Sequence, residues 1–118
     1  MSELSVNISD GPNAVSKVVV VVGEMDESSL DTIKSQMDPL LADVNIKNII
    51  FDLRQLEFIN SKGIGYLVSV HTHLSKDQRE LILAGANEAV MDVISLVGLT
   101  TIIKYFNTYE EALAGLSA

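Results

Sequence analysis

Ser61 is the side chain of this sequence that is best placed for chemistry, because it stands where a strand pattern gives way to a helical one. The apolar run from Asn48 to Leu53 is typical of a strand covered on both faces, and Ile64 and Leu67 then begin a helical spacing. The first turn of a helix has unpaired N–H groups and the positive end of the helix dipole, which favours a negative group. Ser61 is therefore either a helix N-cap or part of a site that a phosphate or a partner's backbone can approach.

The glycines after Ser61 open this turn, but they complete no nucleotide-binding motif. Gly63 and Gly65 remove side-chain bulk, so that a ligand could come close to the backbone. The dinucleotide fingerprint GxGxxG needs a further glycine where Val68 stands, and the sequence contains neither GxxxxGK[ST] nor GxSxG. We therefore expect no catalytic residue and no cofactor, and the protein is predicted not to be an enzyme.

The other polar candidates are expected to be structural. His71 and His73 are two residues apart on a predicted helix, so they point in different directions and cannot bind one metal ion. We expect His71 to be partly buried on the apolar stripe and His73 to lie at the surface. Asp52 and Arg54 flank the end of a strand, where an exposed ion pair contributes only about 0–1 kcal/mol. No metal site is predicted.

A second polar segment follows the strand that ends near Val22. Glu24, Asp26 and Glu27 make this segment acidic. Carboxylates at a helix entry interact favourably with the helix dipole, which explains their presence without any function.

The composition limits the partners and the compartment. The 118 residues include 16 acidic and 8 basic ones, and the formal net charge of −8 repels nucleic acid and anionic membranes. Apolar residues make up 47% and aromatic residues 5%, so the core must be aliphatic. The sequence has no cysteine, which is compatible with a reducing cytosol. Residues 1–10 lack the pattern of a signal peptide. We expect a cytoplasmic, soluble protein.

Strand and helix patterns alternate along the chain. Polar and apolar residues alternate over residues 4–8, and the DGPN sequence of residues 10–13 is a turn signal, so the first two strands should form a hairpin. Pro39 lacks an N–H group and is expected to kink the first helix. Thr108 and Glu111 have the spacing of a capping box. The expected strands are 4–8, 17–22 with an end at Gly23, 46–53, 80–84 and 102–106, and the expected helices are 27 or 28 to 44, 61–75, 88–96 and 109–116.

This order predicts an α/β fold in a single domain spanning residues 1–118. Strands that alternate with helices become parallel neighbours through right-handed crossovers, and the hairpin adds an antiparallel edge strand. The result is a mixed, mostly parallel five-stranded sheet with about four helices. Functional residues collect at the carboxyl ends of strands in such sheets, so the loops at 23–26 and 54–61 are expected to form one surface.

The segment FINSKGIG, residues 58–65, resembles the phosphorylation loop of the STAS-domain anti-sigma-factor antagonists of bacteria. Ser61 matches the phosphoacceptor of that loop, and Gly63 matches its glycine. Asn60 stands where an acid is usual, and Lys62 replaces a residue that is frequently Ser or Thr. The resemblance therefore implies that Ser61 is a phosphorylation site.

Two further segments are similar to the same family. Residues 18–33, VVVVVGEMDESSLDTI, are similar to its second strand and the helix after it, and residues 81–113 are similar to its last two strands and two helices. The resemblance implies the STAS fold, in which the two polar loops meet a regulatory partner. The partner-binding residues that it implies are Glu24, Asp26, Asn60, Ser61, Lys62, Gly63 and Ile64.

The resemblance also implies a protein–protein switch. With Ser61 unmodified, the chain would bind an anti-sigma factor that is also a serine kinase and thereby free a sigma factor for transcription. Phosphorylation adds about −1.5 to −2 charges and would release that partner, and a separate serine phosphatase would restore the hydroxyl. ATP would belong to the kinase. The alternative is a constitutive STAS interaction module in a signalling scaffold or a transporter complex, and no oligomeric state is predicted.

Overall fold

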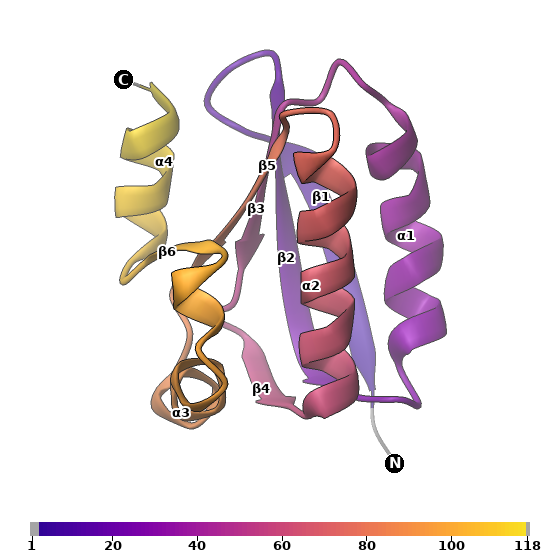
Figure 1. Ribbon diagram of the computed structural model, residues 1–118, viewed down its shortest axis with the longest axis vertical. Helices are drawn as coiled ribbons and strands as arrows, with labels where there is room; N and C mark the ends of the chain where they lie inside the picture. Colours follow the sequence, from indigo (N-terminus) through magenta and orange to yellow (C-terminus); the bar gives the residue numbers. More distant parts are fainter. Residues whose placement is uncertain (1–2, 118) are drawn as a thin grey trace.

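The fold is a mixed β-sheet with two helices side by side on one face and a third helix on the other (Figure 1). The computed structural model describes residues 3–117. Its strands are β1 (Leu4–Asp10), β2 (Ser16–Met25), β3 (Asn48–Asp52), β4 (Leu56–Ile59), β5 (Glu80–Ala84) and β6 (Lys104–Phe106). Its helices are α1 (Leu30–Ala42), α2 (Ser61–Ser75), α3 (Glu88–Leu96), the 3₁₀ turn η1 (Leu99–Thr101) and α4 (Tyr109–Ser117).

The sheet has the predicted class and topology, with one strand more than predicted. Its strand order is β1-β2-β3-β5-β6, in which β1 is antiparallel to β2 and the other neighbours are parallel. The predicted mixed α/β fold is therefore confirmed. The additional strand, β4, lies in the segment 54–61 that was expected to be a loop. Its burial does not alternate, because Leu56 and Ile59 are buried at its ends and the two residues between them are exposed, so it lacks a strand signal.

β2 continues past Gly23, where it was expected to end. Gly23 has a φ of 109°, a conformation that residues with a side chain rarely adopt, and the pairing register shifts there. Before Gly23 the strand pairs with β3, and from Gly23 to Met25 it pairs with β4. A Cβ atom at Gly23 would also collide with the carbonyl oxygen of Glu3. Gly23 therefore redirects β2 toward β4 and brings Met25 beside the start of α2.

The first helix, α1, begins at Leu30, later than the predicted residue 27 or 28, because a turn over residues 26–29 precedes it. It continues through Pro39 to Ala42. Val44, the last residue of the predicted helix, lies beyond the observed one and is 57% exposed. The stripe buries Ile33, Met37 and Leu40 against the rest of the core.

The core consists of two mostly aliphatic clusters, one on each face of the sheet. Val19, Val21 and Phe51 belong to the larger cluster, which includes buried residues of α1, α2 and α3. The alternate residues Val18 and Ile50 belong to the smaller cluster, which α4 covers. Each aliphatic side chain buried in this way contributes about 1.5–3 kcal/mol. The two-sided burial of β2 and β3 agrees with their continuous apolar sequences.

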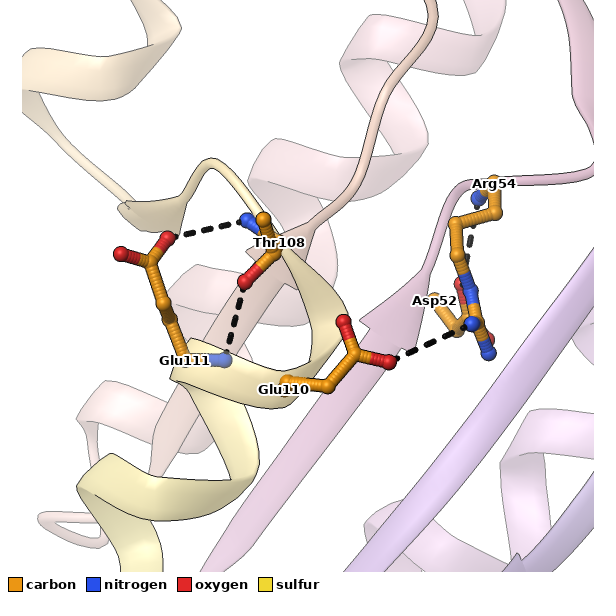
Figure 2. Close-up of polar contacts among 5 residues, drawn as sticks. All are labelled: Asp52, Arg54, Thr108, Glu110 and Glu111. Carbon is orange, nitrogen blue, oxygen red and sulfur yellow. Dashed lines mark hydrogen bonds and ion pairs between the residues drawn. The ribbon is translucent and has the colours of Figure 1, made fainter.

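Arg54 connects the end of β3 to the start of α4 (Figure 2). Its Nε and Nη2 atoms donate to the Asp52 carboxylate at 2.9 and 2.7 Å, and its guanidinium lies 4.3 Å from the centre of the Tyr109 ring. Its Nη1 atom is 3.8 Å from Glu110. The Asp52 side chain is fully buried, so the pair is not the exposed one that was expected. Loss of Arg54 would leave a buried carboxylate without its cation, which is much more costly than loss of a surface pair.

The capping box at the start of α4 is confirmed. The Thr108 N–H donates to Glu111 Oε1 at 3.1 Å, and the Glu111 N–H donates to Thr108 Oγ1 at 3.0 Å (Figure 2). Each side chain thus satisfies a backbone donor of the other residue. The predicted burial of the two histidines is also confirmed, because His71 is partly buried and His73 is exposed.

Candidate functional site

Ser61 is the first residue of α2, and it is exposed. The helix N-cap is Asn60, whose Oδ1 atom accepts hydrogen bonds from the N–H groups of Lys62 at 3.0 Å and Gly63 at 3.2 Å. The interpretation of Ser61 as the N-cap is therefore wrong. The signal was present in the sequence, because asparagine is among the preferred N-cap residues. Since Asn60 caps the helix, the Ser61 hydroxyl is not used for capping and is accessible at the surface.

Gly63 holds the first turn of α2 close to the end of β2. A Cβ atom at Gly63 would lie 2.7 Å from the Met25 carbonyl oxygen and 2.7 Å from Ile59 Cγ1, both closer than real Cβ contacts. A Cβ atom at Gly65, by contrast, would meet no atom within 4 Å. The expectation that both glycines make room for a ligand therefore needs correction at Gly63, which is buried and makes room for the protein's own backbone.

The two polar loops meet, as the sequence predicted, and they are joined by direct hydrogen bonds. The Asn60 N–H donates to the Met25 carbonyl oxygen at 3.2 Å. The Asn60 side-chain Nδ2 atom donates to Glu27 Oε2 at 2.8 Å. This bond is the largest cause of a lowered pKa of Glu27. The β2–α1 turn, residues 26–29, and the first turn of α2 therefore form one continuous surface around Ser61.

The acidic residues at the end of β2 and in the β2–α1 turn differ in exposure. Asp26 is buried, and its Oδ1 atom accepts hydrogen bonds from the Ser28 N–H at 2.9 Å and the Ser28 hydroxyl at 2.6 Å. Glu24 is half-buried, and its carbonyl oxygen accepts a bond from the Ser29 hydroxyl at 2.8 Å. Glu27 is exposed and directly faces the Ser61 turn through Asn60. Sequence reasoning noted Glu27 as part of the acidic segment but did not select it as a site residue.

The surroundings of Ser61 combine one cation with carboxylates and an apolar side chain. Lys62 is exposed, Ile64 is half-buried, and the Phe58 side chain of β4 is 46% exposed. An open hollow of about 630 Å³ lies beside the β2–α1 turn and is lined by Glu3, Glu24 and Glu57 among other residues. Such a mixture of charged and apolar groups is compatible with contact by another protein.

The histidines of α2 are far from Ser61. Both histidines lie at least ten residues further along α2, which at 1.5 Å per residue is about 15 Å away, so neither can activate the hydroxyl. Within residues 3–117, no group of His, Cys, Asp and Glu side chains could hold a metal ion. None of the helices in that range combines the length and the apolar character that a membrane crossing needs.

Comparison with known proteins identifies the family. The model of the STAS domain family matches residues 4–112. The chain belongs to the STAS family. This confirms the resemblance seen in the sequence. The STAS domain is 24% identical over 99 residues to the anti-sigma F factor antagonist of Paenibacillus polymyxa, covering 84% of this chain and 85% of that protein.

Solved structures share the STAS fold. The crystal structure of an anti-sigma factor antagonist from Mycobacterium paratuberculosis has a TM-score of 0.86 and 22% identity, with 98% of this chain and 96% of that one covered. The structure of the Bacillus cell fate determinant SpoIIAA in its phosphorylated form has a TM-score of 0.72 and 20% identity, with 95% and 99% covered. At these identities the likeness shows the fold of the STAS domain.

The different surroundings of the two glycines predict opposite effects of one substitution. Gly63→Ala is expected to lower the free energy of unfolding by about 2 kcal/mol, because the new methyl group meets the Met25 carbonyl, which cannot rotate away. Gly65→Ala is expected to raise it by about 0.5–1 kcal/mol, because alanine favours the helix and the site is open. Urea unfolding of both variants measures the difference. Equal effects of the two substitutions would contradict the packing role of Gly63.

Proposed function

We propose that this STAS domain is an anti-sigma-factor antagonist whose binding to an anti-sigma factor is controlled by phosphorylation of Ser61. The observation that carries the proposal is the exposed Ser61 hydroxyl, free of capping, at the N-terminus of α2 and beside the acidic β2–α1 turn. The names of the relatives support the class of partner. The phosphorylated form of a structural neighbour supports the type of modification.

The proposed contact surface is the one formed by the two turns. Its exposed or half-buried members are Glu24, Asn60, Ser61, Lys62 and Ile64, and its buried members Asp26 and Gly63 hold the surface in shape. With Ser61 unmodified, this surface binds the anti-sigma factor and releases the sigma factor that the anti-sigma factor held. The protein acts by binding, without a reaction of its own, in the cytoplasm where these partners and ATP are found.

Phosphorylation of Ser61 reverses the binding. The anti-sigma factor acts as a serine kinase: a bond forms between Ser61 Oγ and the γ-phosphorus of ATP, the bond to ADP breaks, and the hydroxyl proton passes to a base of the kinase. The phosphate brings about −1.5 to −2 charges to a surface that already holds Glu24 and Glu27. A separate serine phosphatase removes the phosphate and restores the binding form.

Intact-mass spectrometry after incubation with the cognate anti-sigma factor and ATP tests the site. We expect the wild-type chain to gain one phosphoryl group and Ser61→Ala to gain none. Ser75→Ala is a matched control, because Ser75 is an exposed serine at the other end of the same helix. It should gain the group as the wild type does. An equal gain in Ser61→Ala would overturn the assignment.

A second function is favoured by one observation, the amide of Asn60 where the family usually has an acid. In that case the STAS domain is a constitutive interaction module of a signalling scaffold or a transporter complex. Stable binding of the anti-sigma factor that ATP does not reverse, with no mass gain on Ser61, would favour this function over the switch.

A further inference from the structure

Asn60 makes two kinds of hydrogen bond that an acid at the same position could not make together. Its Oδ1 atom accepts the N–H groups of Lys62 and Gly63, while its Nδ2 atom donates to Glu27 Oε2 at 2.8 Å. An aspartate could still accept the two backbone N–H groups, but it has no N–H to offer to Glu27. The bond to Glu27 therefore requires the amide.

Glu27 is held in place to receive this bond. It belongs to the β2–α1 turn, which is fixed by the hydrogen bonds of Asp26 with Ser28 and of Ser29 with Asp26. Its pKa is lowered by the bond from Asn60 and then by a backbone hydrogen bond, so near neutral pH it is a carboxylate and can only accept. An aspartate at position 60 would place a second carboxylate at hydrogen-bonding distance from it, and like charges this close repel.

We propose that Glu27 determines which residue can precede Ser61, and that Glu27 and Asn60 form a positioning pair that holds the β2–α1 turn against the first turn of α2. The asparagine at position 60 is thus the residue that Glu27 requires, and its presence in place of the usual acid does not imply a loss of function. The part of this inference that concerns phosphorylation rests on the proposed function, whereas the coupling of the two side chains does not.

A double-mutant cycle with Glu27→Gln and Asn60→Asp tests the pair. Aspartate and asparagine are equally good N-caps, and a negative charge favours the helix N-terminus. Helix capping therefore gives no reason for Asn60→Asp to lower the stability, and any loss reports on the contact with Glu27. We expect it to lower the urea midpoint in the wild-type background, where Glu27 repels it. In the Glu27→Gln background we expect no loss, because the introduced glutamine amide can donate to the introduced aspartate and restore the bond with the roles reversed. If Asn60→Asp changes the urea midpoint equally in both backgrounds, the proposed coupling of Glu27 and Asn60 is wrong.

The four proteins of the cycle, which are the wild type, the two single variants and the double variant, are then compared as substrates of the cognate anti-sigma kinase. We expect Asn60→Asp to slow phosphorylation at least about fivefold in the wild-type background, and much less in the Glu27→Gln background. An equal slowing by Asn60→Asp in both backgrounds overturns the positioning role. If the wild type itself is not phosphorylated on Ser61, the proposed function fails, and the unfolding cycle still decides whether Glu27 and Asn60 are coupled.

Discussion

Arg79→Met is expected to lower the free energy of unfolding by about 3–5 kcal/mol, one of the two largest effects that the structure predicts. Arg79 precedes β5, and its side chain is fully buried. Its guanidinium donates to the carbonyl oxygens of Ile46 at 2.7 Å, Leu41 at 2.9 Å, Leu40 at 2.9 Å and Asp43 at 3.0 Å. Methionine has a similar length but no donor, so the carbonyl groups of Leu40 and Ile46 would lose the side-chain donor that Arg79 provides. The Asp43 carbonyl would keep the Ile46 N–H at 3.0 Å, and the Leu41 carbonyl lies 3.3 Å from His73 Nε2.

The position of these carbonyl groups explains the size of the effect. Leu40 and Leu41 belong to the last turn of α1, whose carbonyl groups have no partner within the helix, and the helix dipole there favours a cation. The planar guanidinium reaches several acceptors at fixed angles. A lysine ammonium does not have this geometry, so we expect Arg79→Lys to restore only part of the loss.

Urea unfolding compares Arg79→Met with Lys34→Met, the same loss of charge at an exposed position of α1. The control is expected to change the free energy of unfolding by less than about 0.5 kcal/mol. Ser61 is the first residue of α2, whereas Arg79 follows the last residue of α2 and directly precedes β5, so phosphorylation of the folded variant should be unaffected. A loss below about 1 kcal/mol for Arg79→Met would contradict the capping role.

Arg79 also shows what a sequence pattern cannot reveal. Three of its acceptors come from residues 40–43 and the fourth from residue 46, more than thirty positions away, so no local spacing marks the interaction. The helices 61–75 and 88–96 and the strand 80–84, by contrast, were predicted at the observed boundaries, because their periods and flanking residues are local signals. The sequence predicts elements well where the determinant lies within the element.

The features of the candidate site also divide into those that the sequence predicted and those that it did not. Its place at the strand-to-helix junction and the meeting of the two loops followed from topology, since carboxyl ends of parallel strands share one edge of the sheet. The roles of Gly63 and Asn60 did not follow, because they depend on the closeness of Met25 and Glu27, which only the pairing of β2 with β4 produces. β4 itself was missed, and with it the contacts that it creates.

Phosphorylation of Ser61 is expected to weaken binding of the anti-sigma factor about a thousandfold, which corresponds to about 4 kcal/mol. Ser61 is exposed in the proposed contact surface, and the preceding residue, Asn60, donates a hydrogen bond to the Glu27 carboxylate. A dianion in this place loses its water shell when the partner docks, and the neighbouring Glu27 carboxylate offers it no compensating charge. Isothermal titration of the two purified forms with the anti-sigma factor, without ATP, measures the change. Ser61→Ala should bind as the unmodified chain does.

The salt dependence of the lost affinity distinguishes charge repulsion between the phosphate and the partner from simple steric obstruction of the contact surface. Exposed charges are screened over about 8 Å at physiological ionic strength and over about 3 Å at 1 M, so a loss caused by repulsion should shrink as salt is added. A phosphate that merely blocks the surface would cause the same loss at every salt concentration. The far-ultraviolet circular dichroism of the two forms should be the same, because a charge at the surface of α2 changes the interface and leaves the core intact. Equal affinity of the phosphorylated and unmodified forms at low salt would refute the switch.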